Sequence, residues 1–76
     1  MTKAFVLIKS DLGAEQIVLE ELKKIEQVLR VERTFGEYDM VVTMESEHIE
    51  KIRDIISWNI KKLDKVRSTL TLVKKK

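Results

Sequence analysis

The chain has 76 residues, no cysteine, and a net charge of only +2, from 15 lysines and arginines against 13 aspartates and glutamates. This length fits one small domain, predicted over residues 1–76, and the missing cysteines exclude disulfides and thiolate metal sites. The weak net charge argues against nucleic acid as the main partner, and no apolar run is long enough to span a membrane. We therefore expect a cytoplasmic globular domain without a membrane anchor.

The first predicted strand is a continuous apolar run at residues 4–8, which is typical of a strand covered on both faces. Asp11 and Gly13 follow it and are the candidate N-caps of a helix. Apolar residues then recur at helical spacing, opposite a charged side, at Ala14, Ile17, Val18, Leu22 and Ile25. This pattern predicts an amphipathic helix that lies on a sheet.

Residues 28–35 predict a second strand in an edge position. Leu29, Val31 and Phe35 alternate with polar side chains, but Arg33 interrupts the apolar series, as edge strands tolerate. Gly36 then predicts a tight hairpin, because glycine adopts positive φ at little steric cost. Another apolar run at residues 38–44 predicts a central strand.

The second half of the chain predicts one more helix and one more strand. Ser46 is the candidate N-cap, and Glu47 and Glu50 suit the first helical turn. The apolar stripe consists of Ile49, Ile52, Ile56, Ile60 and Leu63, with Ile55 at its margin. Trp58 falls on the side expected to face water, where it is either a contact between dimers or a ring lying over its helix neighbours. The last strand is predicted over residues 66–73.

The element order β-α-β-β-α-β predicts a ferredoxin-like α+β fold, a four-stranded antiparallel sheet with both helices on one face. The first and third strands are expected in the centre, and both carry apolar side chains on both faces. In the first strand, for example, Phe5 and Leu7 alternate with Val6 and Ile8. Because soluble monomers seldom expose an apolar sheet face, we predict a dimer that packs two open sheet faces together.

Few side chains suit catalysis or metal binding. The single histidine, His48, is expected to be solvated in the first turn of the second helix. With no cysteine and no second histidine, the chain cannot assemble a thiol nucleophile or a histidine metal cluster. Glu37 and Asp39 either hold a cation together or are merely solvated at the hairpin tip. The sequence predicts no cofactor, no metal ion and no catalytic residue.

The chain resembles the C-terminal ligand-binding domain of the Lrp/AsnC transcription regulators, the RAM (regulation of amino acid metabolism) domain. The resemblance rests on the strand at residues 4–8, the Gly-Glu-Tyr-Asp turn and strand at 36–42, and the Val-Arg-Ser-Thr-Leu-Thr-Leu segment at 66–72. It extends over residues 4–74. It implies ferredoxin-like domains that dimerise through their sheets and assemble further into rings of dimers, commonly octamers.

The resemblance also implies an amino-acid effector bound between dimers. Carried over by position, the ligand-binding residues are Gly36, Tyr38, Asp39, Ser68, Thr69 and Thr71. Asp39 would take the ammonium group of the ligand, while hydroxyls and backbone N–H groups would take its carboxylate.

Family members normally carry a helix-turn-helix domain before this region, whereas Met1 stands shortly before the first predicted strand. The chain therefore resembles the stand-alone form of the domain, for which no direct DNA binding is expected. We expect a non-enzymatic, amino-acid-binding regulatory domain that also co-assembles with full-length Lrp/AsnC proteins. The alternative is a structural assembly module that modulates those regulators without a ligand. A third possibility, a dimeric ferredoxin-like enzyme, needs a titratable group inside a sheet-face pocket, and the sequence offers no obvious one.

Overall fold

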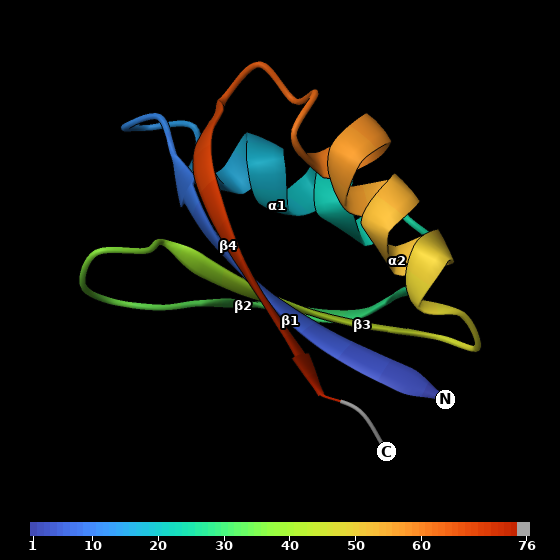
Figure 1. The fold of residues 1–76 in the computed structure, drawn as a ribbon. Helices are drawn as coiled ribbons and strands as arrows, with labels where there is room; N and C mark the ends of the chain where they lie inside the picture. The colour runs from blue at the N-terminus through green and yellow to red at the C-terminus, as the bar shows by residue number, and fades with distance from the viewer. Residues whose placement is uncertain (75–76) are drawn as a thin grey trace.

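The computed structural model describes residues 1–74, so the last two lysines of the predicted domain lie outside the described residues. The elements are β1 (Thr2–Ser10), α1 (Glu15–Lys23), β2 (Val28–Arg33), β3 (Met40–Ser46), α2 (Ile49–Ile55), the π-helical turn η1 (Ile56–Ile60) and β4 (Val66–Lys74). The strands form one antiparallel sheet in the order β2-β3-β1-β4. Both helices lie on the same side of this sheet (Figure 1). The predicted ferredoxin-like fold, with the first and third strands central, is confirmed.

The core lies between the sheet and the two helices. From the sheet, it contains alternate residues of the two central strands: Ala4, Val6, Ile8, Met40, Val42 and Met44. From the helices, it contains Val18, Leu19, Leu22, Ile52, Ile55, Ile56 and Ile60. In the strands every second side chain faces the helices, and in the helices the side chains three or four residues apart face the sheet. These side chains form one core layer, which determines the buried face of each strand and helix.

α1 begins differently from the prediction. Ala14 occupies the N-cap position, and no side chain caps the helix. Its N–H instead donates to the carbonyl oxygen of Asp11 at 3.0 Å, so a turn of the backbone leads into the helix. The predicted N-caps, Asp11 and Gly13, are therefore wrong.

The buried face of α1 is also rotated relative to the predicted stripe. Val18 and Leu22 are buried as expected, but Leu19 is buried with them and Ile17 is 56% exposed. The sheet touches a face centred between Val18 and Leu22, and Leu19 lies one turn before Leu22 on that face. Ile17 is turned away from it, because successive helical residues differ in direction by about 100°.

A bulge in β2 changes which of its residues face the core. The pairing with β3 shifts register between Val28 and Arg30, which adds one residue to β2. Val28 and Val31 both pack against the core, whereas Leu29 is 56% exposed and Phe35 lies fully exposed beyond the strand. The predicted edge position is confirmed, but the predicted strand over residues 28–35 is too long, since Phe35 lies beyond its end at Arg33. The predicted alternation also fails at Leu29, because it cannot account for the extra residue in the bulge.

Two predicted boundaries move as well. β3 begins at Met40 rather than at residue 38, because the Thr34 N–H and hydroxyl bond to the turn at the Asp39 and Tyr38 carbonyls, at 2.9 and 2.8 Å. β3 continues to Ser46, so this residue is not the N-cap of α2. His48 occupies that position, and its N–H donates to the Ser46 hydroxyl at 3.4 Å.

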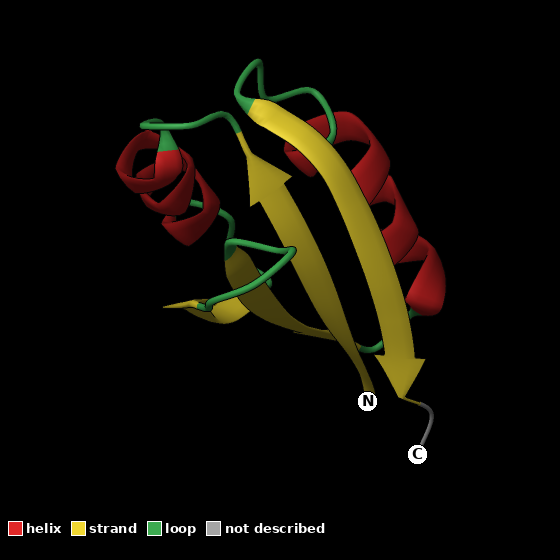
Figure 2. Cartoon of the chain, turned by 90° about the vertical axis from the view of Figure 1, so that its left-hand side faces the viewer, coloured by secondary structure: helices red, strands yellow, loops and turns green. Residues whose placement is uncertain are grey.

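The side of the sheet away from the helices carries an apolar patch. In the antiparallel register, Phe5 pairs with Leu72, and Leu7 lies between Val41 and Leu70. Leu70 and Leu72 are 45% and 53% exposed, and within residues 1–74 no element covers this side (Figure 2). We call Phe5, Leu7, Val41, Leu70 and Leu72 the open-face patch. The prediction that apolar side chains occupy both faces of the sheet is confirmed.

Candidate functional site

The turn between β2 and β3 carries three of the predicted ligand-binding residues, Gly36, Tyr38 and Asp39. Gly36 is exposed and has φ +109°, a backbone conformation that residues with a Cβ atom rarely adopt. Tyr38 and Asp39 are half-buried. Gly36 allows the chain to reverse direction, so that Asp39 lies next to the end of β1.

The carboxylate of Asp39 is bound to the end of β1. Its Oδ2 atom accepts hydrogen bonds from the Ser10 N–H at 2.8 Å and from the Ser10 hydroxyl at 3.1 Å. The Asp39 N–H in turn donates to the carbonyl oxygen of Ile8 at 2.8 Å. Ser10 is only 5% exposed, so its polar atoms depend on this carboxylate. Asp39 therefore fastens the turn to β1, whatever else it does.

The three hydroxyl residues of the predicted site lie on β4. Ser68 pairs with Lys9 of β1 and is exposed, on the same side of the sheet as the open-face patch. Thr69 and Thr71 pair with the buried residues Ile8 and Val6, so they lie on the helix side. One protomer thus divides these hydroxyls between the two faces of the sheet.

The structure brings the two halves of the predicted site to the same end of the sheet. Asp39 meets the last residue of β1 from the side of β3, and Ser68 flanks the same end of β1 from the side of β4. β1 lies between them, and Thr71 is three residues further along β4. The halves are neighbours across one strand rather than walls of a shared pocket.

Two shallow grooves follow β4 on its outer side. The first, of about 330 Å³, is lined by Lys61, Val66, Arg67, Ser68 and Thr69. The second, of about 380 Å³, lies between Thr71 and Val73 and the helical residues Arg53, Ile56 and Lys61, among others. Neither groove includes Gly36, Tyr38 or Asp39.

Sequence analysis missed four residues of this region: Ser10, Arg53, Lys61 and Arg67. Ser10 and Asp39 are 29 positions apart, and no pattern in the chain connects them. Arg53 and Lys61 do show a signal, since they share one helix face with Ile49 and Ser57 at intervals of four. This face becomes part of a groove only because the fold places it beside Thr71 and Val73 of β4.

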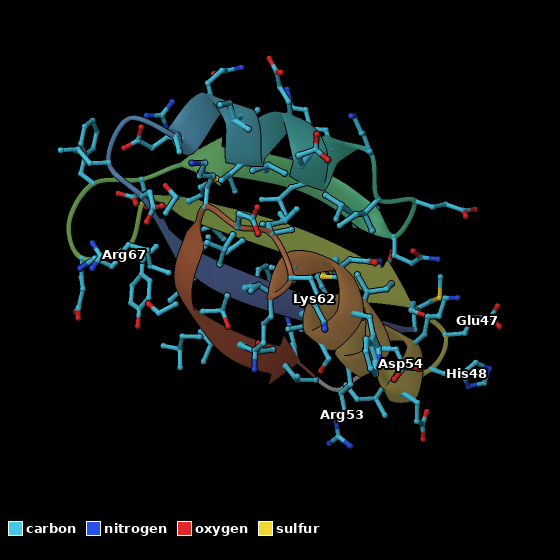
Figure 3. The ribbon with its side chains drawn as sticks, turned by 90° about the horizontal axis from the view of Figure 1, so that it is seen from above. Glu47, His48, Arg53, Asp54, Lys62 and Arg67 are labelled. Atoms are coloured by element: carbon cyan, nitrogen blue, oxygen red, sulfur yellow. The ribbon has the colours of Figure 1, made fainter. Side chains whose placement is uncertain are left out.

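The proposed cation pair and the histidine do not add to this site. Glu37 lies in the same turn but is exposed, and Asp39, two residues further on, is bound by Ser10. His48 is exposed at the start of α2, where it points away from the body of the protein (Figure 3). Within residues 1–74, no three His, Asp or Glu side chains gather as ligands for a metal ion.

Trp58 lies in η1 and is 68% exposed, on the water-facing side that the sequence predicted. The ammonium nitrogen of Lys62 stands 5.1 Å from the centre of its ring, a cation–π distance. Together with Ile25 and Leu63, these side chains line a groove of about 460 Å³ between α1 and η1. None of the helices in the described part of the chain is long and apolar enough to cross a membrane.

Comparison with known proteins identifies the family of this chain. A family model described as the Lrp/AsnC ligand binding domain matches residues 3–74. The HTH-type transcriptional regulator FL11 of Pyrococcus abyssi is 41% identical over 56 residues, which are 70% of this chain and 37% of the relative. FL11 of Pyrococcus furiosus is 30% identical over 70 residues, 92% of this chain and 46% of the relative. The chain spans less than half the length of these two curated relatives.

Solved structures share the whole fold. The crystal structure of TTHA0845 from Thermus thermophilus superposes with a TM-score of 0.95 at 30% identity, covering 100% of this chain and 95% of that one. A transcriptional regulator of Neisseria meningitidis, crystallised as a complex with L-Met, superposes with a TM-score of 0.89 over 99% of this chain and 50% of its own. Its identity is only 14%, so this likeness shows the fold alone.

Proposed function

The chain belongs to the Lrp/AsnC ligand-binding domain family, and from this premise we propose that it is a self-assembling domain that binds an amino acid and regulates transcription. In this proposal it is not an enzyme. It acts in the cytoplasm on amino-acid metabolism, by sensing an effector and by co-assembling with full-length Lrp/AsnC regulators.

The observation that carries the assembly half of the proposal is the open-face patch. Its five side chains are contiguous through the registers of β3, β1 and β4, on a face that no described element covers. Leaving such a face in water is unfavourable, because apolar surface contributes roughly 25 cal/mol per Å² when it is buried. A second copy of the same face is the simplest complementary cover, since a two-fold axis makes a patch self-complementary. We propose that these dimers assemble further into a ring, an octamer by family resemblance.

The effector half of the proposal rests on the division of the predicted site. In one protomer Gly36, Tyr38 and Asp39 are separated by β1 from Ser68 and Thr69, and Thr71 lines a different groove from Ser68. A ligand that contacts both halves therefore needs surface from a second copy. The complex of the Neisseria meningitidis regulator with L-Met indicates the class of ligand to test first.

The test combines light scattering on a sizing column with thermal unfolding in the presence of each of the twenty amino acids. We expect a multimer of dimers, and stabilisation by one or a few amino acids. A ligand at a hundred times its dissociation constant adds about 2.7 kcal/mol to the free energy of unfolding of a protein that binds it only when folded. A stable monomer would contradict the assembly half directly.

One observation favours the alternative, an assembly module without a ligand. The carboxylate proposed to hold the ligand's ammonium is already bound by Ser10 through Oδ2. A multimer whose melting temperature and size respond to none of the twenty amino acids would support this alternative. A response to L-Met or another amino acid would exclude it.

A further inference from the structure

The two outer strands of the sheet differ in how their free edges are protected. β2 has six residues, contains the bulge, and exposes charged side chains, with Arg30 and Glu32 paired at 3.6 Å. Short length, bulges and charges are the usual means by which proteins prevent an outer strand from pairing with another chain. β2 therefore carries the protection expected of a free edge.

β4 lacks most of this protection. It has nine residues, and its pairing with β1 continues without a shift from Lys3 to Lys9. Its charged residues, Arg67 and Lys74, stand near its ends, while the middle contains only hydroxyl and apolar residues. Within residues 1–74 no strand pairs with the outer edge of β4 (Figure 2), so its outward backbone N–H and C=O groups are free to pair with another strand.

The grooves beside this edge carry charge of one sign only. Lys61 lines both grooves, Arg67 lines the first and Arg53 the second, and no aspartate or glutamate among the described residues lines either one. Arg67 lies beside the beginning of β4, and Arg53 points outward near its end (Figure 3). Arg67 also stands 3.8 Å from Asp11, but the two side chains are 63% and 46% exposed, so solvent screens the pair and it is weak.

We propose that the outer edge of β4 binds an extended, carboxylate-bearing segment of another protein as a fifth strand. The backbone of the segment pairs with β4. Every second side chain of the segment then lies on the helix side, at a spacing of about 7 Å. Carboxylates at these positions meet Arg53 and Lys61, with the Thr69 and Thr71 hydroxyls on the same side. Charge complementarity selects the partner, and the strand edge provides the binding mode.

The same charges disfavour a second copy of this chain as the occupant. Two β4 strands paired antiparallel about a two-fold axis form one continuous sheet, with the helices of both copies on the same face. The two sets of cations in the grooves would then lie on one surface, on either side of the new strand pair, and repel each other. An acidic segment has the opposite preference.

The experiment uses a fluorescent, end-capped peptide of eight residues that alternates glutamate and valine, mixed with the whole chain at low ionic strength. We expect saturable binding by fluorescence anisotropy. Replacing each glutamate by lysine, or methylating every backbone nitrogen of the acidic peptide, should each weaken binding at least about tenfold, because one removes the charge match and the other the strand pairing. Protection of β4 amides against hydrogen exchange should accompany binding.

Variants of the protein provide the second arm. Reversing both groove cations, as Arg53→Glu with Lys61→Glu, should weaken binding of the acidic peptide at least about tenfold. Lys51→Glu is the matched control, since Lys51 is exposed on the same helix but lines neither groove, and it should retain binding within about twofold. Circular dichroism checks that each variant is folded.

Three results would overturn the proposal. The acidic peptide does not bind, or the methylated peptide binds as well as the parent peptide, which would leave only unspecific charge attraction. Alternatively, free glutarate, a dicarboxylate without an amino group, displaces the peptide at a similar concentration, which would make the groove a site for small anions. None of these outcomes depends on an effector between dimers, so this proposal and the proposed function fail separately.

Discussion

At the scale of single residues, Asp39 has one observed role and one proposed role, which need to be separated. Its Oδ2 atom accepts two hydrogen bonds from Ser10, a residue with almost no access to water. The proposed function gives the same carboxylate a second task, neutralising the ammonium group of an amino acid. Removal of the whole side chain would disturb both, so loss of ligand binding in such a variant would prove little.

A pair of substitutions separates the roles. Asp39→Ala leaves the buried Ser10 N–H and hydroxyl without a partner, and we expect it to lower the free energy of unfolding by about 2 kcal/mol in urea titrations. Asp39→Asn keeps an acceptor oxygen and should cost less than about 1 kcal/mol, yet it removes the charge. Under the proposed function, Asp39→Asn should abolish stabilisation by the effector. Equal stability of the alanine variant and the unmodified chain would refute the anchoring role.

At the scale of elements, α1 shows how a helix is rotated by what it covers. Leu19 is buried against the sheet, and Ile17 two positions earlier is mostly in water. The two residues are similar in size and hydrophobicity, so their side chains alone do not predict which of them is buried. The rotation of α1 on the sheet decides it.

Alanine substitutions test this rotation. Leu19→Ala opens a cavity in the core and should lower the free energy of unfolding by about 3 kcal/mol. Ile17→Ala removes a side chain from the surface and should change it by less than about 1 kcal/mol. Both are measured by urea unfolding followed by circular dichroism. Comparable losses in the two variants would mean that the helix is rotated differently in solution.

At the scale of the whole molecule, the open-face patch is the feature that bears on the oligomeric state of the domain. One layer of helices can cover only one face of a four-stranded sheet, and this chain has apolar side chains on both. A small domain of this size buries only roughly 60% of the surface of its unfolded chain, so the proposed burial between copies would add substantially to its stability.

A charge placed in the patch tests the proposed dimer. Leu7 lies between Val41 and Leu70, and Leu7→Glu would bury an unpaired carboxylate between the two sheets. We expect this variant to elute as a monomer with its circular dichroism unchanged, because burial of an unpaired charge costs several kcal/mol. Leu12→Glu is the control, since Leu12 is 97% exposed in a loop outside the sheet, and it should leave the assembly unchanged. A dimer that survives Leu7→Glu would contradict packing through this face.

The candidate site was predictable only in part. Gly36 indicated the turn, because glycine is the residue type that readily adopts positive φ and is recognisable in the sequence. The role of Ser10 and the basic grooves along β4 could not be predicted. The Ser10–Asp39 bonds join residues far apart in the chain, and Lys61 and Thr69 meet only because β4 follows the helix back across the sheet.

The sequence by itself determined the order and type of the elements, the central position of β1 and β3, and the apolar character of both sheet faces. These features follow from local periodicity and from the few ways in which β-α-β-β-α-β chains pack. Only the tertiary structure decided the bulge in β2, the rotation of α1, the anchoring of Asp39 by Ser10, and the division between two faces of the hydroxyls that were predicted to bind a ligand. The reason is physical: register and rotation are set by contacts between distant segments, and a shift of one residue reverses the face of every side chain that follows.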